Sequence, residues 1–387
     1  MWGGPPEQTL QIQTMYEGNR VGVVIPAYNE EGLVGEVIDA VPTFVDRVYV
    51  VDDRSTDGTW REIRDRAERA NRATVADERS TAEWSVAERS LADGGVAASG
   101  RVVPIRHEEN RGVGGAIKTG YRRAHEEEMD VTAVVAGDGQ MDTDLLDRLL
   151  DPIVAGEADY AKGTRLLDSE FREEMPRFRL FGNRLLTLLT QVASGYWRTT
   201  DPQNGYTAIS YRALGRLDFE DLYDDYGFAN ELLVRLNCHE MRVADVGVPA
   251  IYGDEESSIR YRTFVPKLSW LLLSSFCHRL RVQFESGART PAVGYLAGAL
   301  GLLGSFLAGL LGKSKTAANL GIGGTLALGL AIYRDRDSND GLETRVTADD
   351  DSEAGEASAM DDRSATYEVS TTDEVSATDE ASETDAR

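Results

Sequence analysis

The sequence predicts an α/β domain with a mostly parallel sheet, followed by a membrane-spanning hairpin of two helices and a disordered acidic tail. Three observations support this prediction. Short β-branched runs alternate with segments of helical spacing over roughly residues 20–255, a pattern that favours parallel strands joined by helices. Two long uncharged stretches follow, and the chain then becomes strongly acidic.

Apolar runs and cap residues place the elements of the α/β domain. The first four strands are predicted at residues 21–25, 47–51, 102–105 and 131–136. Helical spacing predicts helices at 30–40, 112–125 and 145–154, and N-cap residues at 55–57 indicate another helix after the second strand. A basic helical region at 171–200 precedes strands at 204–210 and 243–248, with a helix at 230–237 between them.

Changes in composition predict the domain boundaries. Residues 1–19 form a polar lead-in, and residues 20–262 form the main domain, with a solvent-exposed insertion at 71–100. Residues 263–288 mix aromatic and leucine side chains with cations, which predicts an amphipathic helix lying in a membrane interface. A core helix of the main domain is the alternative.

The stretches 291–312 and 316–333 carry no charged side chain. Each is long enough to span a bilayer, and their glycine and alanine content suits close helix packing. A hairpin leaves both of its ends on one side of the membrane. Arginines near those ends outnumber the two lysines of the turn, which predicts that the domain and the tail are cytoplasmic. The tail at 334–387 has few large apolar residues and is predicted to be disordered.

The formal net charge is −25, with five lysines against 36 arginines. Such acid excess with little lysine predicts a protein of a high-salt cytoplasm. It argues against a duplex nucleic acid partner, because phosphate binding needs a basic patch. Two cysteines make neither a disulfide framework nor a zinc site, and the N-terminus has no signal-peptide pattern, so we expect a reducing compartment.

Polar side chains follow three of the predicted strands. The first strand ends in Pro-Ala-Tyr-Asn-Glu-Glu (26–31), the second in Asp52-Asp53 and the fourth in Gly-Asp-Gly-Gln (137–140). In an open α/β sheet, ligands collect at the carboxyl ends of the strands. Several carboxylates there suit a divalent metal that holds a diphosphate, or a ribose hydroxyl. The chain has no phosphate-binding P-loop, no dinucleotide fingerprint and no nucleophile elbow.

Seven segments in order resemble the family 2 glycosyltransferases, which have the GT-A fold, and most closely their dolichyl-phosphate mannose or glucose synthase branch. The segments are VVIPAYNEE, VYVVDDRSTDGT, ENRGVGGAIKTGY, AVVAGDGQMD, KGTR, DPQNGY and YGFANELL. The resemblance implies a Rossmann-like, nucleotide-sugar-binding domain. It also implies an inverting transfer of a hexose to dolichyl or polyprenyl phosphate at the membrane, for glycan assembly.

The resemblance assigns residues to the nucleotide-sugar donor. It implies that the end of the first strand lines the base and ribose pocket, with Asp53 at the nucleoside end of the donor and Lys118 near it. The pocket residues are Pro26, Ala27, Tyr28 and Glu30. UDP-glucose and GDP-mannose both remain open as donors, and so does the oligomeric state.

Asp138 is implied as the ligand of Mg²⁺ or Mn²⁺, helped by Gln140. Related enzymes often carry an acid two positions earlier, where this chain has Ala136. We therefore expect fewer protein ligands to the metal.

An anionic lipid phosphate needs no general base, so cations would position it. The resemblance implies that Arg165 does so, with Arg177 and Arg179 from the basic run. Arg260 or Arg262 would replace a lysine that relatives carry near the domain end.

Two alternatives stay open. If the acceptor were a hydroxyl of a lipid-linked oligosaccharide or glycolipid, a base would be required, and Glu231 or an acid of Asp224-Asp225 would supply it. The chain could also be an inactive nucleotide-sugar-binding scaffold, in which case Ala136 would mark the loss of a metal-binding acid. The four histidines do not cluster in the sequence, and each is predicted to be structural: His107, His125, His239 and His278.

Overall fold

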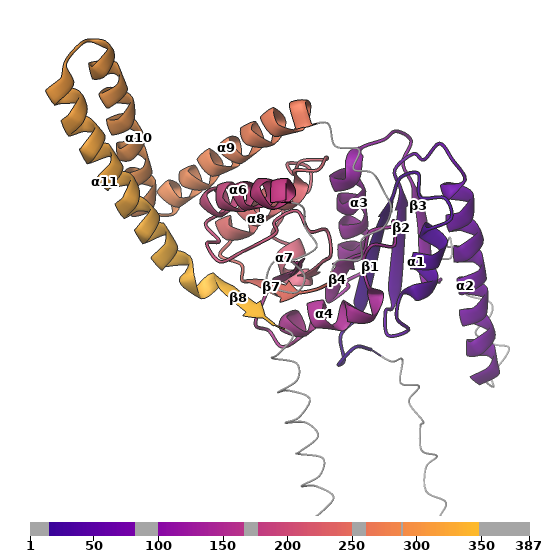
Figure 1. Cartoon of the computed structure of the whole chain (residues 1–387). Helices are drawn as coiled ribbons and strands as arrows, with labels where there is room; N and C mark the ends of the chain where they lie inside the picture. Colours follow the sequence, from indigo (N-terminus) through magenta and orange to yellow (C-terminus); the bar gives the residue numbers. More distant parts are fainter. Residues whose placement is uncertain (1–14, 82–99, 166–176, 250–260, 288, 348–387) are drawn as a thin grey trace, which may run out of the picture. The chain divides into compact units, whose positions relative to one another are not determined.

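The computed structural model describes residues 15–81, 100–165, 177–249, 261–287 and 289–347. In this part of the chain, eight strands form one sheet in the order β3-β2-β1-β4-β6-β5-β7-β8 (Figure 1). The strands are β1 (Val21–Ala27), β2 (Arg47–Asp52), β3 (Val102–Arg106), β4 (Val131–Val134), β5 (Tyr160–Thr164), β6 (Thr207–Ser210), β7 (Val243–Gly247) and β8 (Glu343–Val346).

Helices alternate with these strands. They are α1 (Val34–Ala40), α2 (Thr59–Thr81), α3 (Gly112–Glu126), α4 (Leu146–Val154), α6 (Arg177–Ser194), α7 (Tyr211–Leu214), α8 (Phe228–Cys238), α9 (Tyr261–Ser286), α10 (Arg289–Leu310) and α11 (Ser314–Asn339). Short 3-10 helices are η2 (Thr143–Leu145) and η3 (Asp340–Leu342).

The sheet is mostly parallel, as predicted. Strands β3, β2, β1 and β4 run parallel to one another, β5 runs parallel to β7, and β6 lies antiparallel between β4 and β5. The register pairs Ala27 with Asp52 and Asp52 with Arg106. The carboxyl ends of the first strands therefore lie at one edge of the sheet.

Helices cover both faces of the sheet, with α1 and α2 on one side and α3 on the other (Figure 1). The core on the α3 side joins α3 and α8 to the strands, and includes Tyr121 and Leu236, both fully buried. Gly120 lets α3 lie directly on β1, because a Cβ there would lie 2.3 Å from Cγ1 of Val24. Close packing of this kind holds the strand ends in fixed positions.

Helix α2 continues to Thr81, so the first part of the predicted insertion is helical, which agrees with an insertion that is partly helix, and residues 82–99 lie outside the described part. Two other segments differ from the predictions. Strand β5 was not predicted, because a lysine interrupts its short apolar pattern. Helix α11 runs on to Asn339 and β8 follows. The predicted disordered tail is therefore wrong for 334–347, and the remaining residues, 348–387, are not described.

Helix α9 combines the two alternatives for its segment. One side packs against α6 and α8 and buries Leu268 and Leu272, so α9 is partly a core helix. The other side exposes large apolar residues, and Trp270 is 71% exposed. The apolar residues on the exposed side are Val265, Trp270, Leu273 and Phe284. An exposed apolar face of this kind suits a membrane interface.

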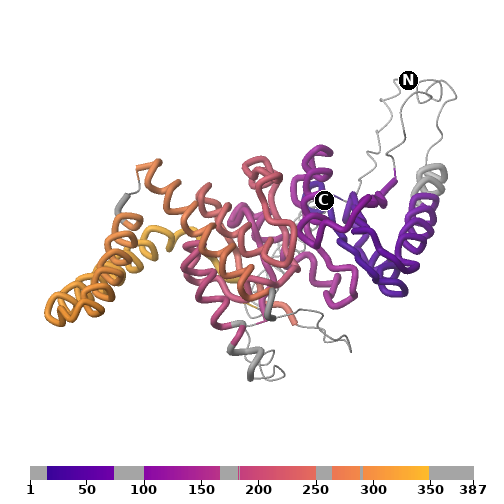
Figure 2. The backbone as a smooth tube through the Cα atoms, turned by 90° about the horizontal axis from the view of Figure 1, so that it is seen from above, coloured from indigo at the N-terminus to yellow at the C-terminus, as the bar shows by residue number. Residues whose placement is uncertain are grey.

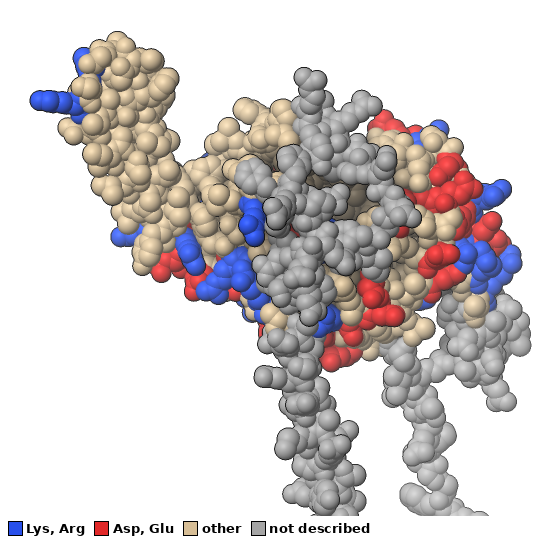
Figure 3. Space-filling view, viewed as in Figure 1, with Lys and Arg blue, Asp and Glu red and all other residues tan. Residues whose placement is uncertain are grey.

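Helices α10 and α11 form a hairpin and lie side by side in two views (Figures 1 and 2). Both are long and apolar enough to cross a membrane by length and composition. Figure 3 shows the hairpin with almost no charged atoms except at its tip, where Lys313 and Lys315 are exposed. The helices approach closely at glycines, since a Cβ on Gly324 would lie 2.8 Å from the backbone nitrogen of Leu302.

Replacing Gly324 with valine is expected to destabilise the hairpin by about 1–3 kcal/mol, because the added side chain has no room against α10. Gly323 offers a matched control, because a Cβ at that position meets nothing within 4 Å. Both substitutions change the same residue type in the same helix, so their difference isolates packing. Thermal unfolding in detergent would measure it, and equal melting temperatures for the two variants would refute the close approach.

A buried ion pair ties the hairpin to the main domain. Arg279 of α9 and Asp335 of α11 are both fully buried and form two parallel contacts of 2.9 Å. Arg279 also donates to the carbonyl oxygens of Val192 and Ala193 at the end of α6. The hydroxyl of Tyr295 in α10 donates to Asp335 at 3.1 Å. Four helices therefore meet at one bidentate pair.

Candidate active site at the carboxyl ends of the strands

The four residues predicted to line the donor pocket lie at the end of β1. Pro26 and Ala27 are its last two residues, and Ala27 is buried. Tyr28 follows with 46% of its surface exposed, so its ring is open to a ligand. The backbone amide of Glu30 donates to Oγ1 of Thr59 at 2.8 Å, which fixes this loop against the start of α2.

Asp53 is buried beside the β1 end, where its amide donates to the carbonyl of Ala27 at 2.9 Å. Its carboxylate contacts Nδ1 of His107 at 2.7 Å and accepts from the amides of Arg111 and Gly112 at 2.8 and 2.7 Å. An acid is favoured at the start of a helix, where amides point outward. The structure thus places Asp53 as the anchor of α3, with His107 as a partner that sequence reasoning missed.

Lys118 is buried within α3 and reaches a neighbouring loop. Its ammonium donates to the carbonyl of Leu222 at 2.7 Å and lies 2.6 Å from Oδ1 of Asp224. The amide of Gly115 donates to the carbonyl of the same Asp224 at 2.9 Å. These contacts hold the loop at 222–224 against α3.

Asp138 and Gln140 lie in the loop that follows β4. The amide of Gly137 donates to the carbonyl of Pro26 at 3.2 Å, so this loop lies beside the β1 end. Oδ1 of Asp138 accepts from the amide of Gln140 at 3.0 Å, a turn that Gly139 permits with its φ of 72°. Oδ2 of Asp138 has no hydrogen-bond partner among the described residues, and the side chain is partly exposed.

The described residues contain no group of three His, Cys, Asp or Glu side chains that could hold a metal. Asp53 instead contacts His107 and two backbone amides, and Asp52 contacts Arg106 and the amide of Ser55. Asp138 and Gln140 are left as the candidate metal ligands.

Arg165 follows β5 and is held by a buried carboxylate. Its Nε and Nη2 atoms donate to Oδ2 and Oδ1 of Asp201 at 2.7 and 3.0 Å. Asp201 is 3% exposed and has a φ of 43°, a left-handed conformation that is uncommon outside glycine. This bidentate pair fixes the plane of the guanidinium.

The other predicted phosphate cations are less fully described. Arg177 and Arg179 lie in the first turn of α6, but their side chains fall outside the description. Arg260 falls in the undescribed segment 250–260, and Arg262 lies in the first turn of α9, where side chains are also left out.

Glu231 lies in α8 and is already engaged. Its Oε2 accepts from the amide of Tyr223 at 2.8 Å, and its Oε1 lies 3.1 Å from Nη2 of Arg235. The side chain is buried. These contacts hold the loop before α8.

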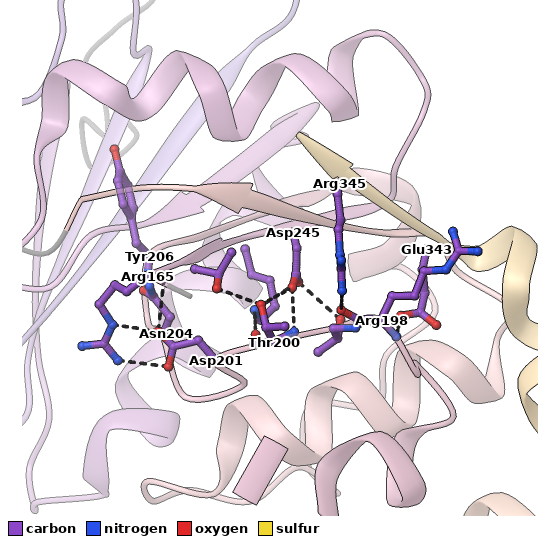
Figure 4. Close-up of polar contacts among 12 residues, drawn as sticks. Arg165, Arg198, Thr200, Asp201, Asn204, Tyr206, Asp245, Glu343 and Arg345 are labelled. Atoms are coloured by element: carbon purple, nitrogen blue, oxygen red, sulfur yellow. Dashed lines mark hydrogen bonds and ion pairs between the residues drawn. The ribbon is translucent and has the colours of Figure 1, made fainter. Parts of the chain in front are cut away.

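A polar network of carboxylates and backbone amides surrounds the loop at 197–201 (Figure 4). Asp245 of β7 and Glu343 of β8 supply the carboxylates. Burial raises the pKa of Glu343 to about 7, against the opposing effect of the amides that it accepts from. Sequence reasoning missed both acids, because neither lies in a recognisable motif.

Two relatives match this chain over most of their own length. The UDP-N-acetylglucosamine–dolichyl-phosphate N-acetylglucosaminyltransferase of Methanococcus voltae is 27% identical over 60% of this chain and 86% of that protein. The undecaprenyl-phosphate mannosyltransferase of Micrococcus luteus is 27% identical over 59% of this chain and 82% of that protein.

Among solved structures, glucosyl-3-phosphoglycerate synthase from Mycobacterium tuberculosis, in complex with Mn²⁺, UDP and glucosyl-3-phosphoglycerate, is 18% identical with a TM-score of 0.46. The match covers 72% of this chain and 86% of that one. The model of the family described as glycosyl transferase family 2 matches residues 22–218, which include β1 to β6 and the strand-end loops. The chain therefore belongs to glycosyl transferase family 2.

Proposed function

We propose that this enzyme transfers a hexose from a nucleotide sugar to a polyprenyl phosphate, of the dolichyl type, at the cytoplasmic face of a membrane. The observation that carries the proposal is the attachment of a long, mostly apolar two-helix hairpin to the catalytic domain through the buried pair of Arg279 and Asp335. The two relatives named above differ in sugar but share a polyprenyl phosphate acceptor in their names. That shared feature supports the acceptor class and leaves UDP-glucose and GDP-mannose open as donors.

The proposed reaction is a single inverting displacement. A phosphate oxygen of the lipid bonds to the anomeric carbon while the bond from that carbon to the nucleotide diphosphate breaks. The electron pair leaves with the nucleoside diphosphate, and no proton needs to be removed because the attacking phosphate is already anionic. Catalysis then depends on positioning and charge stabilisation. We assign Arg165 to the attacking phosphate, and the end of β1 with exposed Tyr28 to the nucleotide.

The donor's diphosphate would be bound at Asp138 and Gln140 together with Mg²⁺ or Mn²⁺. The residues fit such an ion: Asp138 presents a carboxylate oxygen that no described residue uses. Magnesium is typically bound by one or two carboxylates, with substrate phosphates and water completing its shell. When bound, the ion would neutralise charge on the leaving diphosphate.

The hairpin and α9 would hold the active site at the lipid surface. Both ends of the hairpin contact α9, α10 through the ring of Tyr295 against Phe276 and α11 through the pair of Asp335 with Arg279, so both ends lie on one side. Cations on α9 and at the base of α11 support the cytoplasmic orientation.

Replacing Arg165 with alanine is expected to lower polyprenyl phosphate glycosylation about a hundredfold, since one charged hydrogen-bonding group in a transition state contributes about that much. Glu231→Gln should change it less than about fivefold if the acceptor is a phosphate. If the acceptor is a sugar hydroxyl, Glu231 becomes indispensable as the base. Its present contacts with Tyr223 and Arg235 favour the phosphate.

The assay uses the full chain in membranes, dolichyl phosphate and a panel of labelled nucleotide sugars. High salt is included because a net charge of −25 requires screening. Arg216→Ala, at an exposed position after α7, serves as the matched cation control. A wild-type enzyme that labels no polyprenyl phosphate with any donor would overturn the proposal, and failure to release nucleoside diphosphate with any lipid would indicate a scaffold.

A further inference from the structure

The segment that follows the hairpin returns to the catalytic domain and binds one of its loops. Strand β8 joins the sheet beside β7. Oε1 of Glu343 accepts from the amide of Trp197 at 2.6 Å, and Oε2 accepts from the amides of Arg198 and Thr199, the latter at 2.9 Å. One side chain therefore holds three consecutive amides of the loop at 197–201.

A second carboxylate continues the same arrangement. Oδ2 of Asp245 accepts from the amide of Thr200 at 2.6 Å and from its hydroxyl at 2.8 Å. Lys162 of β5 lies 3.1 Å from Oδ1 of Asp245 and also donates to the carbonyl of Thr200. Four successive amides, at 197–200, are thus held by two acids, one from the edge strand β8 and one from its neighbour β7 (Figure 4).

The next residue after these amides is Asp201, the partner of Arg165. Its left-handed backbone is a conformation that persists only when the surrounding contacts impose it. The amides bound by Glu343 and Asp245 are contacts of this kind, because they fix the four residues before it. The position of the Asp201 carboxylate, and with it the plane of the Arg165 guanidinium, follows from that fixed loop.

Surface contacts reinforce the attachment of the loop to the returning segment. Nη2 of Arg198 donates to Oδ1 of Asp340 at 2.5 Å, and Nη2 of Arg345 donates to the carbonyl of Arg198 at 2.6 Å. These groups are exposed, and exposed ion pairs contribute little. Glu343 is the partly buried group that bonds three amides, so most of the ordering rests on it.

We propose that Glu343 is a positioning residue for the acceptor: it orders the loop at 197–201 and so presents Arg165 to the acceptor's phosphate. This inference rests on the proposed function, which assigns Arg165 to that phosphate. The group that orients the acceptor is then controlled from the segment that follows the hairpin. Glu343 itself touches neither donor nor acceptor, so removing it should impair acceptor use and leave donor binding intact.

The test compares Glu343→Ala and Glu343→Gln with wild type in the full-length enzyme. Titrations of dolichyl phosphate and of the nucleotide sugar are made separately. We expect Glu343→Ala to lower kcat/KM for the lipid phosphate about ten- to a hundredfold, as misplacement of a positioning group does. The KM for the nucleotide sugar should stay within about twofold. Glu343→Gln keeps one oxygen acceptor and should lie between alanine and wild type.

Asp337→Asn is the matched control, because Asp337 is an exposed acid on α11 near the same end of the hairpin. It should leave both titrations unchanged. If Glu343→Ala does not fold, Glu343→Gln tests the inference instead. Its loss in kcat/KM for the lipid phosphate is then compared with its change in KM for the nucleotide sugar. Equal losses for donor and acceptor, or no loss for acceptor, would overturn the inference. Failure of the proposed function has a separate signature, which is a wild-type enzyme without lipid phosphate activity.

Discussion

Replacing Asp138 with alanine is expected to reduce hexose transfer about a thousandfold. The leaving diphosphate gains negative charge as the glycosidic bond breaks, and the divalent ion that Asp138 would hold would stabilise that charge, an effect worth about 10²–10³ in rate. Asp138 lies after β4, beside the end of β1. One of its carboxylate oxygens has no hydrogen-bond partner among the described residues. Its loss should leave the fold intact, because its side chain accepts a hydrogen bond from the nearby amide of Gln140, a local turn contact.

Initial rates with saturating donor and lipid phosphate would measure this effect, with thermal unfolding as the check on folding. Asp144→Asn is the control, because Asp144 is exposed in η2, a few residues further along the chain. A chelator should suppress the wild-type rate, and added Mg²⁺ or Mn²⁺ should restore it. An Asp138→Ala variant with the wild-type rate would contradict the assignment of the diphosphate to the loop that follows β4.

Replacing Asp335 with alanine is expected to destabilise the protein by about 3–5 kcal/mol, the usual cost of leaving a buried charge unpaired. Arg279 would remain fully buried with two carbonyl partners, on Val192 and Ala193, and no anion. At about 2–4 °C per kcal/mol for a domain of this size class, the melting temperature should fall by about 6–20 °C. Tyr295 would also lose its acceptor.

Differential scanning calorimetry in detergent would measure the shift, and Asp337→Ala on the same helix should move it by less than about 2 °C. The double variant Arg279→Met with Asp335→Leu should lose less than the two single variants combined, because removing both charges leaves none unpaired. A melting temperature for Asp335→Ala within about 1 °C of wild type would contradict the role of this pair in holding the hairpin.

The sequence predicted those parts of the fold whose residues repeat at a fixed period. Buried β-branched runs located the first four strands, and uncharged length located the hairpin. Strands β5 and β8 escaped prediction for a physical reason. Lys162 is buried in β5, where Asp245 and the carbonyl of Thr200 pair with it, and Glu343 begins β8, where amides of the loop at 197–201 donate to it. Such contacts join residues far apart in the chain, and local pattern carries no trace of them.

The location of the candidate site could be predicted from the sequence, but the roles of all its residues could not. Parallel register puts the β1, β2 and β4 ends together, so the residues that follow them could be expected at one edge. The role of Asp53 could not be predicted, because it depends on which backbone amides contact its carboxylate in the folded chain. The structure explains the partner: Asp52 pairs with Arg106, so Asp53 and His107 are the residues that directly follow β2 and β3 at matching positions.

Strand β8 has a consequence for the order in which the enzyme matures on the ribosome. Synthesis runs from the N-terminus, so β1 to β7 emerge first, α10 and α11 next, and β8 after them. Until Glu343 has left the exit tunnel, the amides at 197–199 lack their carboxylate. The nascent chain therefore completes the contacts of the loop at 197–201 only after both hairpin helices have been made, which, under the proposed function, would couple the onset of activity to arrival at the bilayer.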